Sequence, residues 1–420
     1  MTTGTLSLEL PPHYFRHEFG RLVSVLLRRY GMRRIELCED AAQAALMRAV
    51  QSWSVGSMPD NRGAWLYRVA SNHVLDVLRR EKRDEAFEPD VAPEPDASES
   101  TDSVYLESEV SDDLLRLLFV SADPALAPES QLVLTLKVLC GFNTEEIALR
   151  LFQSEEAVHK RLQRARSRFR LRPLELETPS LQELADRLPR VLHLLYLVFN
   201  EGYSSAQPDR LIRCELCEEA VRLASILVAH PVGAMPQTYA LLALMYLHAA
   251  RFEARIDGAG GLLLLEEQDR SLWDAELIQL GLSYLQRAAP GERMSRYHLE
   301  AAIAAEHCLA TSYADARWDE IARLYAELAQ LNPSPLHVLN RAIALAEWKG
   351  PEAGLRELEA LKPPSWLLGY YLWDATLGEL YRRSGDRERA VTHLERALGS
   401  APTNAEKELL ERRLSACNQE

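Results

Sequence analysis

The chain has 420 residues, 47% hydrophobic and 26% charged, a composition typical of a globular protein with room for two or three domains. Its formal net charge of −14 argues against a protein that coats nucleic acid, so any DNA contact should come from local basic patches. The six cysteines form no disulfide framework, no apolar run is long enough to cross a membrane, and no secretory signal is present. We therefore expect a cytoplasmic protein that makes no membrane contact.

Residues 10–83 are predicted to form amphipathic helices that end in a basic cluster, RREKR, at residues 79–83. The stretch NRGAWLYRVASNHVLDVLRREKR (61–83) combines aromatic and arginine side chains on one helix. Such planar groups stack on unpaired bases, and the preceding loop, SVGSMPDN (54–61), could hold an extruded base. Taken alone, this helix is more often a half-buried surface helix than a strand-opening device. Its expected core-facing residues are Leu66, Val69, Ala70, Val74 and Val77.

Residues 84–113 hold twelve acidic residues and no Lys or Arg, with prolines at positions 89, 93 and 95. A segment of this composition cannot bury a core, so we expect an acidic linker that is mostly disordered by itself. It would join the first helical domain to a second one at residues 114–172.

The second domain contains GFNTEEIALRLFQSEEAVHKRLQRARSRFR (141–170), which is typical of a helix-turn-helix. Asn143 and Glu146 have capping-box spacing, and Ser154 can cap the second helix, after a turn that has Phe152 where glycine is common. On the second helix, an apolar stripe lies opposite a polar face that would enter the major groove, while Arg166 would meet phosphates. The alternative is a solvated basic face on a packing helix. The stripe residues are Val158, Leu162, Ala165 and Phe169; the polar face carries Glu156, His159, Lys160, Gln163 and Arg164.

These segments, together with LCEDAAQAALMRAVQSW (37–53), closely resemble an extracytoplasmic-function (ECF) RNA polymerase sigma factor over residues 13–172. The resemblance implies that the chain binds the β′ clamp and the β flap of the polymerase core, with the helix of residues 37–53 on the β′ clamp. It also implies that the 61–83 helix helps melt the −10 promoter element, that the second helix of the helix-turn-helix reads the −35 element, and that the acidic linker runs through the polymerase cleft. The implied polymerase-binding residues are Glu39, Asp40, Gln43 and Arg48; the −10 residues are Asn61, Arg62, Trp65, Arg68, Asn72, Arg79 and Arg80; the −35 residues are Glu156, His159, Lys160, Gln163, Arg164 and Arg166.

Residues 180–420 are predicted to be helical throughout, which makes the expected fold all-α. LGELYRRSGDRERAVTHLERALGSAP (377–402) has small and apolar residues at the spacing of a tetratricopeptide repeat, and a weaker copy begins at Ala342. The pattern indicates an α-solenoid of stacked helix pairs, whose concave groove could hold a regulatory protein or the chain's own sigma domains.

FNEGY (199–203) and EEQDRSLWD (266–274) resemble the C-terminal extension of the sigma-factor subgroup that carries such a repeat domain. That subgroup has HDAR where this chain reads HAAR (248–251), so one acidic residue is missing. The polar residues of this region follow neither metal-ligand nor nucleophile spacing, and CELC (214–217) has no second cysteine pair. We therefore expect no metal, no cofactor and no enzymatic activity. The polar residues considered are Glu201, His248, Asp257, Glu266, Glu267, Asp269 and Asp274.

The sequence thus predicts a sigma factor that binds RNA polymerase core and promoter DNA. Two alternatives stay open at this point. One is a repeat-containing helix-turn-helix regulator that acts on duplex DNA without entering polymerase. The other is a scaffold in which both basic helices are structural, with little salt-dependent DNA binding.

Overall fold

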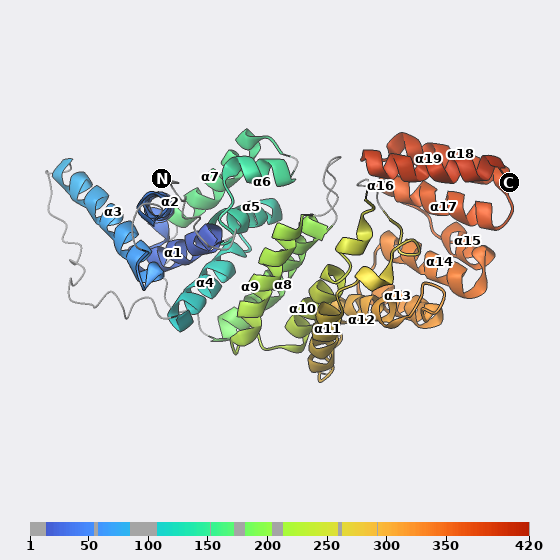
Figure 1. Cartoon of the computed structure of the whole chain (residues 1–420), viewed down its shortest axis with the longest axis horizontal. Helices are drawn as coiled ribbons and strands as arrows, with labels where there is room; N and C mark the ends of the chain where they lie inside the picture. The colour runs from blue at the N-terminus through green and yellow to red at the C-terminus, as the bar shows by residue number, and fades with distance from the viewer. Residues whose placement is uncertain are drawn as a thin grey trace, which may run out of the picture. The chain divides into compact units, whose positions relative to one another are not determined.

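The computed structural model describes residues 14–53, 58–84, 107–151, 153–171, 181–203, 213–258, 263–291 and 293–419. Within these ranges the regular secondary structure consists of helices and includes no strand, which confirms the predicted all-α class. The chain divides into two compact units, residues 1–194 and 195–420. Figure 1 shows the first unit in blue to green and the second from green to red.

The first unit begins with three helices that bury one shared core. Helix α1 packs against α2, and α2 against α3, because each has one apolar face. Leu22, Leu26, Ala42, Leu66 and Val74 in this core are fully buried. The elements are α1 (Tyr14–Tyr30), the 3₁₀ helix η1 (Met32–Arg34), α2 (Ile35–Trp53) and α3 (Arg62–Asp84).

Four further helices follow in this unit, before α8 (Leu181–Tyr203) begins: α4 (Glu107–Ser121), α5 (Pro128–Val138), α6 (Thr144–Leu151) and α7 (Glu155–Leu171). Helix α4 starts inside the expected acidic linker, so residues 107–113 are helical rather than linker. The reason is that the apolar run that begins at Leu114 needs a full helix to bury its face, and Asp113 is drawn into that buried face at 3% exposure. Residues 85–106 of the expected linker lie outside the described residues.

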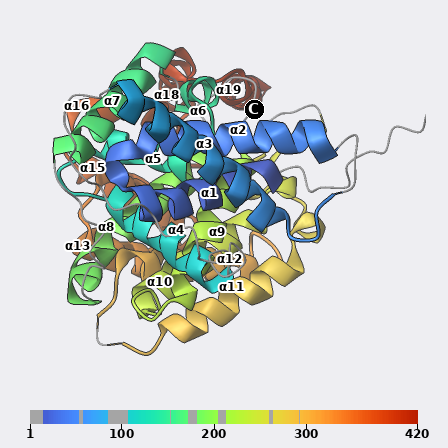
Figure 2. The ribbon, with the colours of Figure 1, turned by 90° about the vertical axis from the view of Figure 1, so that its left-hand side faces the viewer.

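Helix α1 also packs against α4 and α5, and so connects the two groups of helices (Figures 1 and 2). Its Gly20 permits the closest approach, because a Cβ there would lie 2.4 Å from the carbonyl oxygen of Leu139. Nearby, the Arg16 guanidinium lies 4.4 Å from the centre of the Phe142 ring, and Gly141 adopts φ +69° beside the Arg16 backbone. The groups α1–α3 and α4–α7 are therefore in direct contact in this structure.

The second unit is a succession of helices, most of which pack on the next one along the chain, as a solenoid does. The boundary between the units falls at Leu194, inside α8, and residues 172–180, where the sequence suggested a boundary, lie outside the described residues. The elements are α8 (Leu181–Tyr203), α9 (Cys214–Ala229), α10 (Pro236–Ala249), η2 (Glu253–Arg255), η3 (Arg270–Leu272), α11 (Ala275–Ala288), α12 (Arg296–Leu309), α13 (Trp318–Leu331), α14 (Pro335–Lys349), α15 (Pro351–Glu359), α16 (Ser365–Leu368), α17 (Tyr371–Arg383), α18 (Arg387–Ser400) and α19 (Asn404–Gln419).

Small residues mark the helix crossings in the second unit, as the repeat spacing predicts. A Cβ at Gly378 of α17 would lie 2.7 Å from the Leu394 side chain of α18, and one at Gly354 of α15 would lie 2.6 Å from the Ala342 carbonyl oxygen of α14. A third such crossing, at Gly281 of α11 against Leu247 of α10, lies outside the recognised repeats. The helix pairing therefore extends further towards the N-terminus than the repeat pattern shows.

Candidate polymerase and nucleic-acid interface

Helix α7 presents the predicted −35 face as the sequence pattern requires. Asn143 and Glu146 form the predicted capping box at the start of α6, with reciprocal backbone bonds of 2.7 Å, and Ser154 caps α7 through the Ala157 amide at 3.2 Å. The predicted apolar stripe is buried, which fixes the rotation of α7 about its axis. Phe152, in the turn before α7, lies outside the described residues. The stripe residues Val158, Leu162, Ala165 and Phe169 are at most 2% exposed, and Glu156, His159, Lys160, Gln163 and Arg164 are exposed.

The predicted −10 residues of α3 fall into two groups. Arg68, Asn72 and Arg79 are exposed on one face of the helix, with Arg80 exposed beside them, and Leu66, Ala70 and Val74 are fully buried behind them. Val69 and Val77, expected in the core, are half-buried. This face is available to a DNA strand.

The remaining predicted −10 residues have structural contacts of their own. Asn61 accepts a hydrogen bond from the Ala64 amide at 3.0 Å and so caps α3. Trp65 is half-buried, with its ring centre 5.5 Å from that of Trp53, and Arg62 is half-buried too. Of the loop expected to hold a base, residues 54–57 lie outside the described residues.

Helix α2 carries an exposed face that includes residues the sequence interpretation missed. Asp40 and Gln43 are exposed, as a docking face requires, and so is Arg48. Met47 and Val50 follow at helical spacing on the side of Asp40 and Gln43, and are 59% and 48% exposed. Solvent-exposed apolar residues beside polar ones are typical of a protein-binding surface. The sequence signal was present, because both positions fall outside the buried alanine stripe of α2.

Two predicted site residues, one from each group of helices, bind each other. The Arg166 guanidinium of α7 donates a 2.6 Å hydrogen bond to Glu39 of α2, and its second nitrogen lies 3.4 Å from Glu36. Glu39 is only 5% exposed, and burial raises the pKa of its carboxyl, an effect that Arg166 opposes. In this structure, therefore, Glu39 and Arg166 are not presented to polymerase or DNA.

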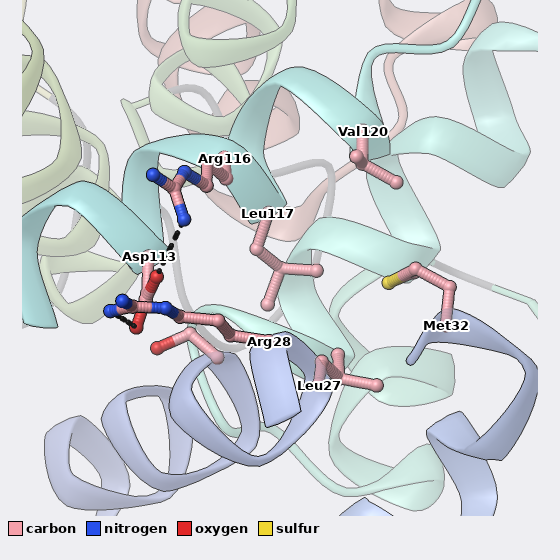
Figure 3. A pocket seen from close by; sticks show the side chains of 8 residues that line it. Leu27, Arg28, Met32, Asp113, Arg116, Leu117 and Val120 are labelled. Carbon is pink, nitrogen blue, oxygen red and sulfur yellow. Dashed lines mark hydrogen bonds and ion pairs between the residues drawn. The ribbon is translucent and has the colours of Figure 1, made fainter. Parts of the chain in front are cut away.

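A pocket between α1 and α4 contains a further buried carboxylate, shown in Figure 3. Asp113 lies between the Arg28 guanidinium at 3.6 Å and the Arg116 guanidinium at 3.4 Å. Burial raises the pKa of Asp113 to about 6, and the two arginines reduce that shift. The contact between the two groups of helices thus contains a group that titrates in mildly acidic solution.

Among the residues that the structure describes, no group of three or more His, Cys, Asp or Glu side chains could hold a metal ion. The cysteine pair of CELC has a structural environment instead. Cys217 is 1% exposed and its thiol donates to the Phe199 carbonyl oxygen at 3.4 Å, while burial raises its pKa well above the ordinary range. None of the helices described here is both long and apolar enough to span a bilayer.

Comparison with protein families identifies two of these segments. Residues 15–84 match sigma-70 region 2, and residues 124–169 match sigma-70 region 4. Both matches indicate a sigma factor over these two segments of the chain. The region 2 match thus spans α1–α3, and the region 4 match spans α5, α6 and nearly all of α7. Residues 187–289 match a third model, a family of unknown function called DUF6596. That match covers the start of the predicted repeat region, so a tetratricopeptide identity is not confirmed there.

Two relatives match longer stretches of the chain than these family models do. An uncharacterized protein of Rhizobium meliloti (strain 1021) is 37% identical over 375 residues, which cover 89% of this chain and 88% of the relative. The ECF RNA polymerase sigma factor SigG of Mycobacterium tuberculosis is 29% identical over 196 residues. That match covers 41% of this chain, which spans about half the length of SigG. No solved structure matches the chain.

Proposed function

We propose that this chain is an ECF-type sigma factor that binds RNA polymerase core, recognises −10 and −35 promoter elements and starts transcription without bond-making chemistry. The observation that carries the proposal is the pair of exposed polar helix faces, on α3 in region 2 and on α7 in region 4, each supported by a buried apolar face. A cytoplasmic location follows from such a role.

In this proposal α2 docks on the β′ clamp through Asp40, Gln43, Arg48 and the apolar pair Met47 and Val50. A mixed apolar and polar face of this kind favours a polymerase subunit over a regulator that acts on duplex DNA alone, because the regulator needs no such protein-binding surface. Glu39 would join this docking face only after its ion pair with Arg166 has opened.

The two DNA contacts differ in chemistry. On α3, Arg68, Asn72 and Arg79 would hold the −10 strand through backbone charge and base contacts. On α7, Lys160 and Gln163 would contact base edges of the −35 element, and Arg164 would meet the phosphates.

The domain organisation that we propose is residues 10–83 for region 2, an acidic linker up to residue 106, residues 107–172 for region 4, and a C-terminal regulatory solenoid. The solenoid would regulate the sigma portion or bind a partner protein in its groove. Its matched small residues at helix crossings support a tetratricopeptide-like architecture in residues 342–402.

The decisive experiment is co-purification of the full chain with core polymerase, followed by transcription from a promoter library. We expect a stable complex and transcripts from promoters with one shared −10 and −35 pair. Failure to bind core would reject the proposal. Comparison with residues 1–180 under the same conditions tests the regulatory role, because unchanged output in all conditions would reject it.

A further inference from the structure

Three segments of the second unit that the sigma function does not use meet in one place. FNEGY supplies Tyr203, HAAR supplies His248 and Arg251, and EEQDRSLWD supplies Arg270 and Trp273. The Tyr203 and His248 rings are 4.6 Å apart between centres, and the Tyr203 hydroxyl accepts a 2.7 Å hydrogen bond from Arg251. Segments up to 70 positions apart in the chain, from 203 to 273, thus build a common cluster.

Three arginines lie over the aromatic rings of this cluster, and we call Arg251, Arg255 and Arg270 the arginine cluster. The Arg255 guanidinium carbon is 4.0 Å from the centre of the Tyr203 ring. Those of Arg270 and Arg251 are 4.4 Å and 5.6 Å from the centre of the Trp273 ring. Stacking of this kind fixes the plane of a guanidinium group and leaves its N–H edges free to bind.

The hydrogen bonds of the arginine cluster go to neutral acceptors. Arg255 donates to the Tyr203 carbonyl oxygen at 2.7 Å, and Arg270 donates to the carbonyl oxygens of His307 and Ala310 at 2.7 and 2.8 Å. Within the described part of the chain, no carboxylate lies within ion-pair distance of these three arginines. Their positive charges are therefore not neutralised by any of the described residues, which is costly in a partly buried position.

The neighbouring side chains of His248 and His307 carry no negative charge, and both burial and the arginines lower their pKa values. Burial, together with Arg251 and Arg270, lowers the pKa of His307 to about 3. Burial and the nearby arginines also lower the pKa of His248 well below its ordinary value. Asp315, whose charge opposes the lowering of the Arg270 pKa by burial, is exposed and accepts hydrogen bonds from Thr311 and Ser312.

Several buried donors of the cluster have no acceptor among the described residues. They are the Arg251 Nε, one terminal nitrogen of Arg270 and the Trp273 Nε1. Arg251 is 9% exposed and Trp273 is 7% exposed, so these groups are largely removed from solvent. A buried N–H group without an acceptor is unfavourable, and three in one cluster indicate that an acceptor binds there.

We propose that the arginine cluster is a binding site for an oxyanion, a phosphate or a carboxylate group, carried by a small molecule. The negative charge of an oxyanion would neutralise the arginines, and its oxygens would accept hydrogen bonds from the N–H groups that have no acceptor among the described residues. Arg255 and Arg270 are half-buried rather than sealed, so an anion can reach them from solvent. The second unit would then be a ligand-binding unit attached to a sigma factor.

Binding is measured on the full chain without polymerase or DNA, so that the result is independent of the proposed sigma function. The probes are inorganic phosphate and citrate, added at constant ionic strength against sodium chloride, with calorimetric titration and the thermal unfolding temperature as readouts. We expect saturable binding and a rise in unfolding temperature with at least one probe. The absence of saturable binding with both probes would overturn the proposal.

Arg270→Gln is the test variant, and Arg287→Gln is its matched control. Arg287 also stacks on aromatic rings of the second unit, 4.2 Å from the centre of Tyr239, but lies outside the cluster. We expect Arg270→Gln to weaken binding by about tenfold or more, as loss of a charged hydrogen-bond donor does, and Arg287→Gln to leave it unchanged. Equal effects of both variants would reject the site. If Arg270→Gln fails to fold by circular dichroism, Arg255→Gln replaces it, with the same expectation.

Discussion

At the scale of single residues, the ion pair between Glu39 and Arg166 links the proposed polymerase-docking helix to the proposed −35 helix. Glu39 is buried, and Arg166 supplies the positive charge that balances its carboxylate there. The pair therefore favours the arrangement in which regions 2 and 4 are in contact. Either residue can serve its proposed role only when the two regions separate.

Arg166→Gln is expected to weaken the contact between the two regions by about 3 kcal/mol, because it leaves Glu39 buried without a charged partner. The free protein should then open, and its affinity for core polymerase in the absence of DNA should rise. Energy transfer between dyes on α3 and α7 measures the opening. Arg164→Gln, an exposed neighbour on α7, is the control and should change neither quantity. An unchanged dye separation in Arg166→Gln would contradict the expectation.

Asp113 predicts a pH dependence of stability. Its folded pKa of about 6 lies above the ordinary value of 3.8, so the folded state holds this proton more tightly than the unfolded state. Stability from this group is therefore greatest below pH 4 and is lost as the pH rises to 6. Asp113→Asn should remove that loss. Between pH 4 and pH 7, the free energy of unfolding of the variant should therefore rise by on the order of 2 kcal/mol relative to that of the natural chain. Urea unfolding at both values measures this gain, and the exposed Asp112→Asn should show none.

At the scale of elements, α7 illustrates what the sequence determines locally. Its cap, its buried stripe and its exposed face all come from residues within one helix, so periodicity alone predicted them. The partner of Arg166 could not be predicted in this way, because Glu39 lies 127 residues earlier in the chain and the contact depends on how two groups of helices pack. The same holds for the arginine cluster, whose members come from separate helices and loops.

On the exposed face of α7, substitutions of base-contacting and of phosphate-contacting residues should have different effects on promoter binding by the polymerase complex. Gln163→Ala is expected to cost about 1–3 kcal/mol on the best promoter and to relax selection at one −35 base pair. Arg164→Gln should weaken binding equally on all promoters and reduce the dependence of log affinity on log salt by about 0.9. Promoter-library binding at several salt concentrations measures both effects. Identical profiles for the two variants would contradict the proposed division between base and phosphate contacts.

At the scale of the whole molecule, each unit buries its own core. Region 2 packs around Leu22 and Leu66, whereas the solenoid has separate clusters around Ile321 and around Leu394. Sequence periodicity predicted helices throughout both units. It could not place a boundary at Leu194, because that position lies inside α8 and the helix continues across it.

Separate cores predict two unfolding transitions in calorimetry of the full chain. Phosphate or citrate should raise only the transition of the second unit, because the proposed oxyanion site lies wholly within it. The chain of residues 1–180 identifies the transition of the first unit and should show no response to either anion. A single transition that shifts as a whole would contradict the independence of the two units.

At Gly20, the addition of one methyl group would push the helices of region 2 away from those of region 4. A Cβ at this position would lie 2.4 Å from the Leu139 carbonyl oxygen, and a backbone atom cannot move aside as a flexible side chain can. Gly20→Ala would therefore separate regions 2 and 4, although alanine stabilises the helical conformation of α1 more than glycine does. Under the proposed function, this variant would expose Glu39 and Arg166 in the free chain, before any polymerase binds.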